Sequence, residues 1–285
     1  MSFRLPNLIV IGAMKSGTTS IHDYLNQHPD IYMSETKEID FFIEEKNWNK
    51  GVKWYKNNFF SNSTICGESS QNYSKRHHFK PGVPKKIYEL IPDTRIIYLV
   101  RDPIQRIVSH YHEALEGGYP PKEGLNQYLT KNPEDNHYIL TSSYYYQISA
   151  YLEFFPKDKI LIISLDSLRS HRLETMNKIF RFLNLSECND NSLFDFTRNT
   201  SETKRSKNIV GNFLYGQSSS NFRKIFPRDL KDHIKSNKFT KYLTTNPIKR
   251  EEITEDTFSL LAKYLQEDVD KFRRFTGYSF SDWIV

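Results

Sequence analysis

The stretch from Leu8 to Thr19, L-I-V-I-G-A-M-K-S-G-T-T, decides the fold expected for this 285-residue chain. Its first four residues form an unbroken apolar run, which is typical of a strand buried on both faces of a parallel sheet. Gly12 and Gly17 follow with Lys15 between them, and apolar residues then recur at helical spacing as far as Pro29. The stretch therefore predicts a strand, a glycine-containing turn and a helix.

A turn of this kind is suited to bind an anion. Free backbone N–H groups at the start of the helix point to one spot, beside the positive end of the helix dipole. Lys15 adds a positive charge, and Thr18 and Thr19 add hydroxyl groups on the first helical turn. We therefore expect a phosphate or sulfate site; the alternative is an ordinary strand-to-helix turn with a solvated lysine.

The turn differs from the P-loop of nucleotide triphosphatases. In that loop a lysine directly follows the second glycine, and a Ser or Thr follows the lysine. Here Thr18 follows Gly17, and the lysine lies inside the turn at Lys15. The displaced lysine indicates an anion that is held differently, without the arrangement of Mg²⁺ and triphosphate.

Composition indicates a soluble protein with anionic ligands. The chain is 38% hydrophobic and 26% charged, with a formal net charge of +6, and this mild basic bias suits anions. It has no Lys/Arg-rich block typical of nucleic-acid binding. Its longest apolar runs, about six residues, are too short to cross a bilayer. With two cysteines, no C-x-x-C motif and no apolar signal segment, we expect a cytoplasmic protein.

Strands and helices are predicted to alternate along the chain. Apolar runs predict further strands near residue 65 and at 95–100 and 159–164. Helical spacing predicts helices over 84–90, 104–115, 144–155, 171–183 and 258–272. The segments 30–63 and 196–211 are expected to be irregular. No linker or repeat is visible, so we predict one α/β domain over 1–285, a P-loop-like three-layer fold with a central parallel sheet flanked by helices.

A second candidate anion site follows the strand at 95–100. Arg101, Asp102 and Pro103 come directly after it, and Ser109 lies two turns into the helix that Pro103 begins. A guanidinium and a hydroxyl that face one crevice can hold a phosphate monoester. Alone, this pattern is more simply a structural Arg–Asp pair. Because ligands of parallel sheets bind beyond the carboxyl ends of the strands, we expect Arg101 and the Lys15 turn to meet one ligand.

These motifs resemble those of sulfotransferases that use 3′-phosphoadenosine 5′-phosphosulfate (PAPS). The K-S-G-T-T pattern after an apolar strand is similar to the family's 5′-phosphosulfate loop. The resemblance implies that the donor is bound by Lys15, Ser16, Gly17, Thr18 and Thr19. Arg101 and Ser109 match the residues that contact the 3′-phosphate in the family.

The resemblance continues over almost the whole chain. The segment 199–207, N-T-S-E-T-K-R-S-K, resembles the family's late basic loop that closes over the nucleotide. It implies nucleotide contacts by Lys204 and Arg205; the alternative is a solvated basic surface. The ending from Gly277 to Trp283, G-Y-x-x-S-x-W, also matches the usual terminal pattern.

The segment 37–42, K-E-I-D-F-F, resembles the part of heparan sulfate-type sulfotransferases that carries a glutamate base. The resemblance implies Glu38 as general base, with Lys37 or Asp40 orienting it, and Lys15 as the group that stabilises the leaving phosphate. The alternative for Glu38 is a surface carboxylate. His110 and His112 are alternative bases.

The segment 67–73, G-E-S-S-Q-N-Y, resembles the next motif of the family. Heparan-type members carry a lysine and often a proline where this chain has Ser69 and Gln71. The departure favours the broad group of bacterial sulfotransferases with diverse acceptors.

The resemblance thus implies an enzyme that transfers sulfonate from PAPS to a hydroxyl, or in second place an amine, of a glycan or small metabolite. The product of the donor would be adenosine 3′,5′-bisphosphate (PAP), and no metal is implied. The alternatives are a P-loop kinase or nucleotide triphosphatase, and a non-catalytic module that binds an anionic nucleotide or glycan. The sequence leaves the acceptor and the oligomeric state open.

Overall fold

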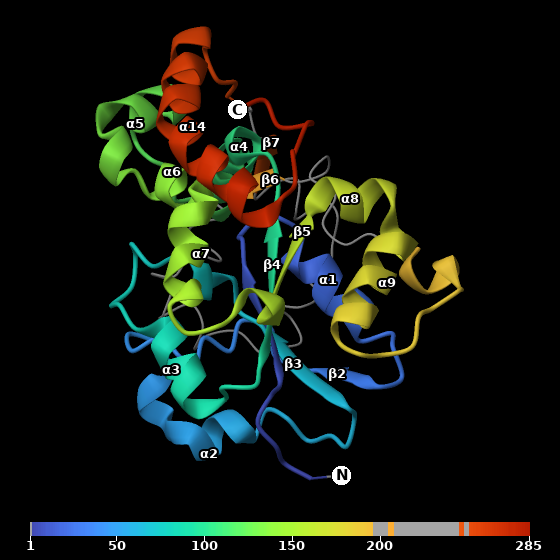
Figure 1. Ribbon diagram of the computed structural model, residues 1–285. Coiled ribbons are helices and arrows are strands. Elements are labelled where there is room, and N and C mark those ends of the chain that lie inside the picture. The colour runs from blue at the N-terminus through green and yellow to red at the C-terminus, as the bar shows by residue number, and fades with distance from the viewer. Residues whose placement is uncertain (1, 196–204, 208–244, 248–250) are drawn as a thin grey trace.

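The computed structural model describes residues 2–195, 205–207, 245–247 and 251–285. Its centre is a parallel sheet with the strand order β2-β3-β1-β4-β5 (Figure 1). The bounds of these strands are Leu8–Gly12 for β1, Ile31–Met33 for β2, Ile65–Ser69 for β3, Arg95–Val100 for β4 and Ile160–Ser164 for β5. Because all five run parallel, their carboxyl ends share one edge of the sheet.

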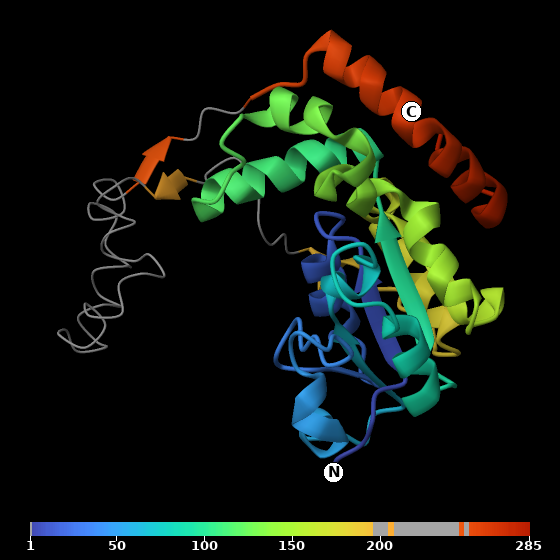
Figure 2. The ribbon, with the colours of Figure 1, turned by 90° about the vertical axis from the view of Figure 1, so that its left-hand side faces the viewer.

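The longer helices cover both faces of the sheet (Figures 1 and 2). They are α1 Thr18–Leu25, α3 Val83–Leu90, α4 Pro103–Gly117, α7 Tyr144–Leu152, α9 Arg172–Phe182 and α14 Glu255–Thr276. Shorter helices are α2 Gly51–Lys56, α5 Leu125–Lys131, α6 His137–Ser142 and α8 Leu165–Ser170.

Two hydrophobic cores lie on the two faces of the sheet. Along β1 the side chains of Ile9 and Ile11 belong to one core, together with residues of α3, α4, α7 and α14. Leu8 and Val10 belong to the other core, with residues of α1 and α9. Each strand residue of β1 is fully buried, as the unbroken apolar run predicted. The expected three-layer α/β architecture is confirmed.

Parts of the expected element map were wrong. The segment 30–63, expected to be irregular, contains β2 and α2, which are too short to show a clear period. The segment 196–211, also expected to be irregular, contains β6, Arg205–Lys207, which pairs antiparallel with β7, Thr245–Pro247. The helices α5, α6 and α8 were not predicted. The single-domain assignment over 1–285 stays a prediction.

The segment around Trp283 and Ile284 contacts the chain directly after β4. The ring of Trp283 stacks on Phe272 of α14 with an interplanar angle of 8°. Next to it, the N–H of Ile284 donates to Oδ2 of Asp102 at 2.7 Å. Oδ1 of the same buried carboxylate accepts the N–H of Gln105 at 2.7 Å and so caps α4. Asp102 therefore joins the chain's last described residues to the start of α4.

We expect Gly12→Ala to lower the free energy of unfolding by roughly 1–3 kcal/mol. Gly12 has φ +143°, and a Cβ there would lie 2.2 Å from Oγ of Ser74 and 3.3 Å from the carbonyl oxygen of Gln71, both in the 3₁₀ helix η2, Gln71–Ser74. Urea denaturation measures the change. Gly51→Ala is the matched control, because Gly51 also has positive φ (+77°) but would place its Cβ in open space. Equal losses in the two variants would show that the contact with η2 does not constrain Gly12.

Candidate functional site

A cleft of about 1130 Å³ opens beside the carboxyl edge of the sheet. The turn after β1, the start of α1, one face of α4, and parts of α8, α9 and the 37–38 segment line it. The structure brings most of the predicted site residues together in this lining: Lys15, Gly17, Thr18, Thr19, Glu38, Arg101 and Ser109.

The turn after β1 has the conformation of an anion site. Gly17 precedes α1 with φ 92° and ψ 17°, a left-handed conformation that glycine adopts without strain. Thr18 and Thr19 are the first residues of α1, so their N–H groups have no partner within the helix. Ser16 is fully buried and lies outside the cleft lining. Its N–H donates to the carbonyl of Ala13 at 3.1 Å, so the backbone of Ser16 serves to close the turn.

Lys15 reaches across the cleft to α4. Its Nζ lies 3.5 Å from Oε2 of Glu113, and the two side chains are 20% and 34% exposed. Glu113 lies one turn after Ser109 on the same face of α4 and was not predicted from the sequence. The pair shows that an anion bound at the turn would lie next to α4.

Arg101 joins the two predicted anion sites. Its Nη1 donates to the carbonyl of Lys15 at 3.4 Å, and its Nη2 donates to Oε1 of Gln105 at 2.9 Å. Burial lowers the pKa of Arg101, but arginine stays charged. Arg169 and Arg172 also line the cleft and add positive charge on the side of α8 and α9. This half of the cleft is therefore suited to hold an anion.

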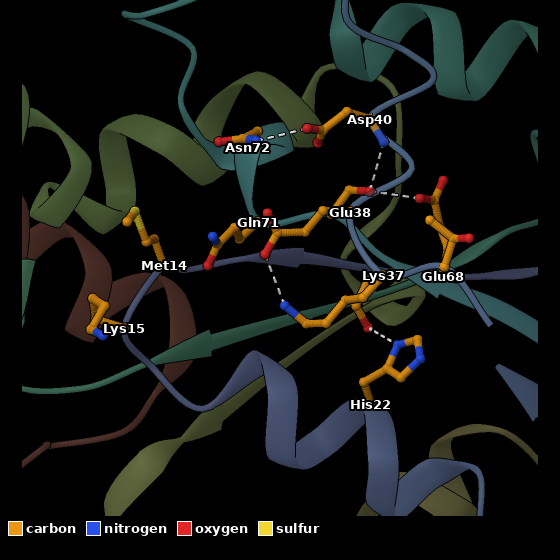
Figure 3. A network of polar contacts seen from close by, with 12 residues as sticks. Met14, Lys15, His22, Lys37, Glu38, Asp40, Glu68, Gln71 and Asn72 are labelled. Atoms are coloured by element: carbon orange, nitrogen blue, oxygen red, sulfur yellow. Dashed lines mark hydrogen bonds and ion pairs between the residues drawn. The ribbon is translucent and has the colours of Figure 1, made fainter. Parts of the chain in front are cut away.

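Glu38 also lines the cleft and lies beside Gln71 (Figure 3). Its N–H donates to the carbonyl of Ser69 at 2.9 Å, and Lys37 Nζ lies 3.0 Å from its Oε1. Of the two neighbours considered from the sequence, Lys37 is the one that contacts the carboxylate. Asp40 does not do so, because its buried carboxylate binds Lys46 and accepts from Nδ2 of Asn72 at 2.8 Å.

A family model described as the sulfotransferase domain matches residues 5–246. The chain belongs to the sulfotransferase family. Human heparan sulfate glucosamine 3-O-sulfotransferase 5 is 30% identical over 196 residues, which are 64% of this chain and 54% of that protein. The bifunctional heparan sulfate N-deacetylase/N-sulfotransferase 1 of Caenorhabditis elegans is 28% identical, over 64% of this chain and 22% of that protein. The chain thus spans about half the length of the first of these relatives, and less of the second.

Solved structures share the fold. A sulfotransferase from Alicyclobacillus acidocaldarius superposes with a TM-score of 0.67 at 20% identity, covering 98% of this chain and 99% of that one. A mouse sulfotransferase complexed with PAP gives a TM-score of 0.53 at 15% identity, covering 99% and 91%. Among the described residues of this sulfotransferase, no helix has the length and apolarity needed to cross a membrane.

The two histidines considered as bases lie in different environments. His110 is buried outside the cleft lining, with its ring 4.1 Å from that of Tyr138 and Nδ1 3.4 Å from Nη1 of Arg106. Burial, together with Arg106, strongly lowers the pKa of His110. His112 does line the cleft, and its Nε2 lies 3.3 Å from the carbonyl of Glu251. The geometry thus leaves Glu38 and His112 facing the ligand space.

Arg106 is a structural residue of the site that was not predicted from the sequence. Its fully buried guanidinium donates to Oγ of Ser142 at 2.6 Å, to the carbonyl of Tyr138 at 2.7 Å and to the carbonyl of Met14 at 3.4 Å. Burial lowers its pKa to about 10, so it remains charged at neutral pH. Arg106 holds the turn after β1 from behind. In the sequence, the signal for Arg106 was its position as a charged residue on the face of α4 that is buried.

The late basic segment is described in part. Lys204 lies outside the described residues. Arg205 begins β6, which lies against α4 near the end of that helix (Figure 2). The nucleotide contacts implied for Lys204 and Arg205 stay predictions.

We expect Arg106→Met to lower the free energy of unfolding by about 2–4 kcal/mol, because it leaves buried oxygens of Tyr138 and Ser142 without their donor. Urea denaturation measures the loss. Arg181→Met is the matched control: Arg181 is 55% exposed and pairs with Glu187 at 2.8 Å, so its loss should cost less than about 1 kcal/mol. A similar small cost for both variants would contradict a supporting role for Arg106.

Proposed function

We propose that this sulfotransferase transfers a sulfonate group from PAPS to an acceptor hydroxyl, and in second place to an amine, by in-line displacement. One observation carries the proposal: a single cleft joins the Lys15 turn at the start of α1 to Arg101 and Ser109 at the end of β4 and on α4. PAPS carries anionic groups at two separate points, its 5′-phosphosulfate and its 3′-phosphate. The fold shared with the mouse sulfotransferase complexed with PAP supports the same donor.

The described residues fit this donor. The N–H groups of Thr18 and Thr19 and the ammonium of Lys15 would hold the 5′-phosphosulfate, because helix N-termini and cations bind such anions. Arg101 and Ser109 would hold the 3′-phosphate. Lys15 would exchange its contact with Glu113 for a donor oxygen. When bound, PAPS supplies an activated sulfonate.

The transfer breaks the bond between sulfur and the 5′-phosphate oxygen and forms one between sulfur and the acceptor oxygen. Glu38 takes the proton of the acceptor hydroxyl, which makes the oxygen a better nucleophile. The negative charge remains on the leaving phosphate, where Lys15 and the N–H groups of α1 stabilise it. The N–H groups of α1 are fixed by the helix, and Lys15 would reach the donor when PAPS binds, so little further reorganisation would be needed during the transfer.

The acceptor proposed here is a glycan or small metabolite without dense negative charge. The part of α4 that lines the cleft carries the carboxylates of Glu113 and Glu116, which disfavour a polyanion beside that helix. Ser69, which replaces a lysine of the heparan-type pattern, is fully buried, and its Oγ lies 2.9 Å from Nδ1 of His22. Gln71, the other departure, does line the cleft and adds an uncharged amide.

Lys15→Ala and Arg101→Ala are each expected to weaken PAP binding at least tenfold, which corresponds to about 1.4 kcal/mol. Isothermal titration calorimetry with PAP, and separately with Mg²⁺-ATP, measures both affinities. Lys85→Ala is the matched control, because Lys85 is exposed and pairs with Glu89 on α3. Preference for Mg²⁺-ATP over PAP would replace this proposal with the kinase or triphosphatase alternative.

Glu38→Gln is expected to reduce kcat by about 10²–10⁴-fold, the usual range for loss of a general base, while the Kd of PAP stays unchanged. Transfer from radiolabelled PAPS, first screened over uncharged sugars, phenols and amines, provides the assay. Glu35→Gln tests an exposed carboxylate three residues earlier and should retain full activity. Wild-type turnover by Glu38→Gln would direct attention to His112, and donor binding without transfer to any acceptor would support a non-catalytic module.

A further inference from the structure

The segment that carries Glu38 has an unusual backbone. Glu38 has φ 62° and Asp40 has φ 51°, and the side chain of Ile39 between them is buried. Non-glycine residues rarely adopt this left-handed conformation, and they keep it where the surrounding structure holds them. The direction of the Glu38 carboxylate therefore depends on what fixes residues 38–40.

Two hydrogen bonds join backbone N–H groups of this segment to the carboxyl end of β3 and to the residue after it. The N–H of Glu38 donates to the carbonyl of Ser69 at 2.9 Å, and the N–H of Asp40 donates to Oγ of Ser70 at 3.1 Å. The first bond uses a backbone acceptor that is always in place. The second depends on a hydroxyl that can rotate, so it needs a partner that orients it.

Glu68 orients that hydroxyl. Ser70 Oγ donates to Oε2 of Glu68 at 2.6 Å. A serine hydroxyl has one proton, so once Ser70 directs it to Glu68, its lone pairs face the N–H of Asp40. The chain from Glu68 through Ser70 to Asp40 thus has one consistent direction of donation.

Glu68 is itself held firmly. It is fully buried, and its Oε1 accepts the hydroxyls of Tyr55 at 2.5 Å and Tyr73 at 3.1 Å. Tyr55 stacks on Phe41 at a centroid distance of 4.3 Å, which ties the network to the segment just after Asp40. Burial raises the pKa of Glu68 to about 7, while the three hydroxyl donors oppose that rise. Glu68 does not line the cleft, so it can act on a ligand solely through its neighbours.

We propose that Glu68 is a positioning residue for Glu38: it orients Ser70, which holds the left-handed segment 38–40 and directs the Glu38 carboxylate into the cleft. The inference rests on the role proposed above for Glu38. The competing explanation is that Glu68 stabilises the core and has no particular effect on residues 38–40.

The test compares Glu68→Gln and Ser70→Ala with the wild-type protein. Gln offers an amide donor where the carboxylate accepted three hydroxyls, and Ser70→Ala removes the acceptor of the Asp40 N–H while Glu68 stays in place. In both variants we expect amide hydrogen exchange in residues 38–42 to accelerate roughly tenfold, as after loss of a hydrogen bond. The kcat should fall by a similar factor, and the Kd of PAP should stay within about twofold of wild type.

Tyr55→Phe is the matched control, because it removes a donor to Glu68 and leaves the chain from Glu68 to Asp40 intact. The rate of amide hydrogen exchange in residues 38–42 should then stay within about twofold of the wild-type rate. Ser70→Ala keeps the proposal testable if Glu68→Gln fails to fold.

The double variant Glu38→Gln/Ser70→Ala distinguishes a role in positioning Glu38 from a role in stabilising the core. If Ser70 acts through Glu38, the residual transfer rate of Glu38→Gln should not fall further. Wild-type exchange in either Glu68→Gln or Ser70→Ala would overturn the proposal, as would an undiminished effect of Ser70→Ala in the Glu38→Gln background. If Glu38→Gln alone keeps full activity, the proposed base is wrong, and the exchange data still decide whether Glu68 holds the segment.

Discussion

In the donor site proposed here, the turn after β1 has to be supported from behind, because its front stays open to the anion. Backbone N–H groups that point at a ligand space cannot be satisfied by the protein itself, so the turn gains its order from contacts on its far side. Arg106 supplies a buried cation behind Met14, η2 packs against Gly12, and Leu165 of α8 lies against Gly17. The remaining parts of the site are placed relative to this fixed turn.

Among the described residues, the cleft contains two lysine–glutamate pairs. Lys15 pairs with Glu113 and Lys37 pairs with Glu38. Each pair holds its lysine at the cleft, and a bound phosphate or sulfate would take the place of the carboxylate as the partner of that lysine. Partly exposed pairs of this kind contribute little stability, so they can be exchanged at low cost. The site is thus ordered by its backbone and adjustable in its side chains.

The strands and helices that could be predicted from the sequence are those with a clear local hydrophobic pattern. The buried run of β1, the strand β4 and the helix begun by Pro103 each have a continuous period and a clear boundary. The two predicted anion sites are placed directly after these strands. Glu68, Arg106 and Glu113 could not be assigned in this way, because their roles depend on partners in other elements. Asp40 illustrates the same limit: it lies two residues from Glu38 but faces Asn72, since its backbone conformation turns it away.

The bond between Ile284 and Asp102 links two points that are 182 residues apart. Asp102 leaves the ribosome long before its partner does, and domains begin to fold while synthesis continues. Until residues 283–285 have been made and have docked, one oxygen of this carboxylate needs water or another donor in place of the Ile284 N–H. The neighbourhood of Arg101 therefore reaches its final form later than the sheet that carries it, because the last strand of that sheet ends at Ser164.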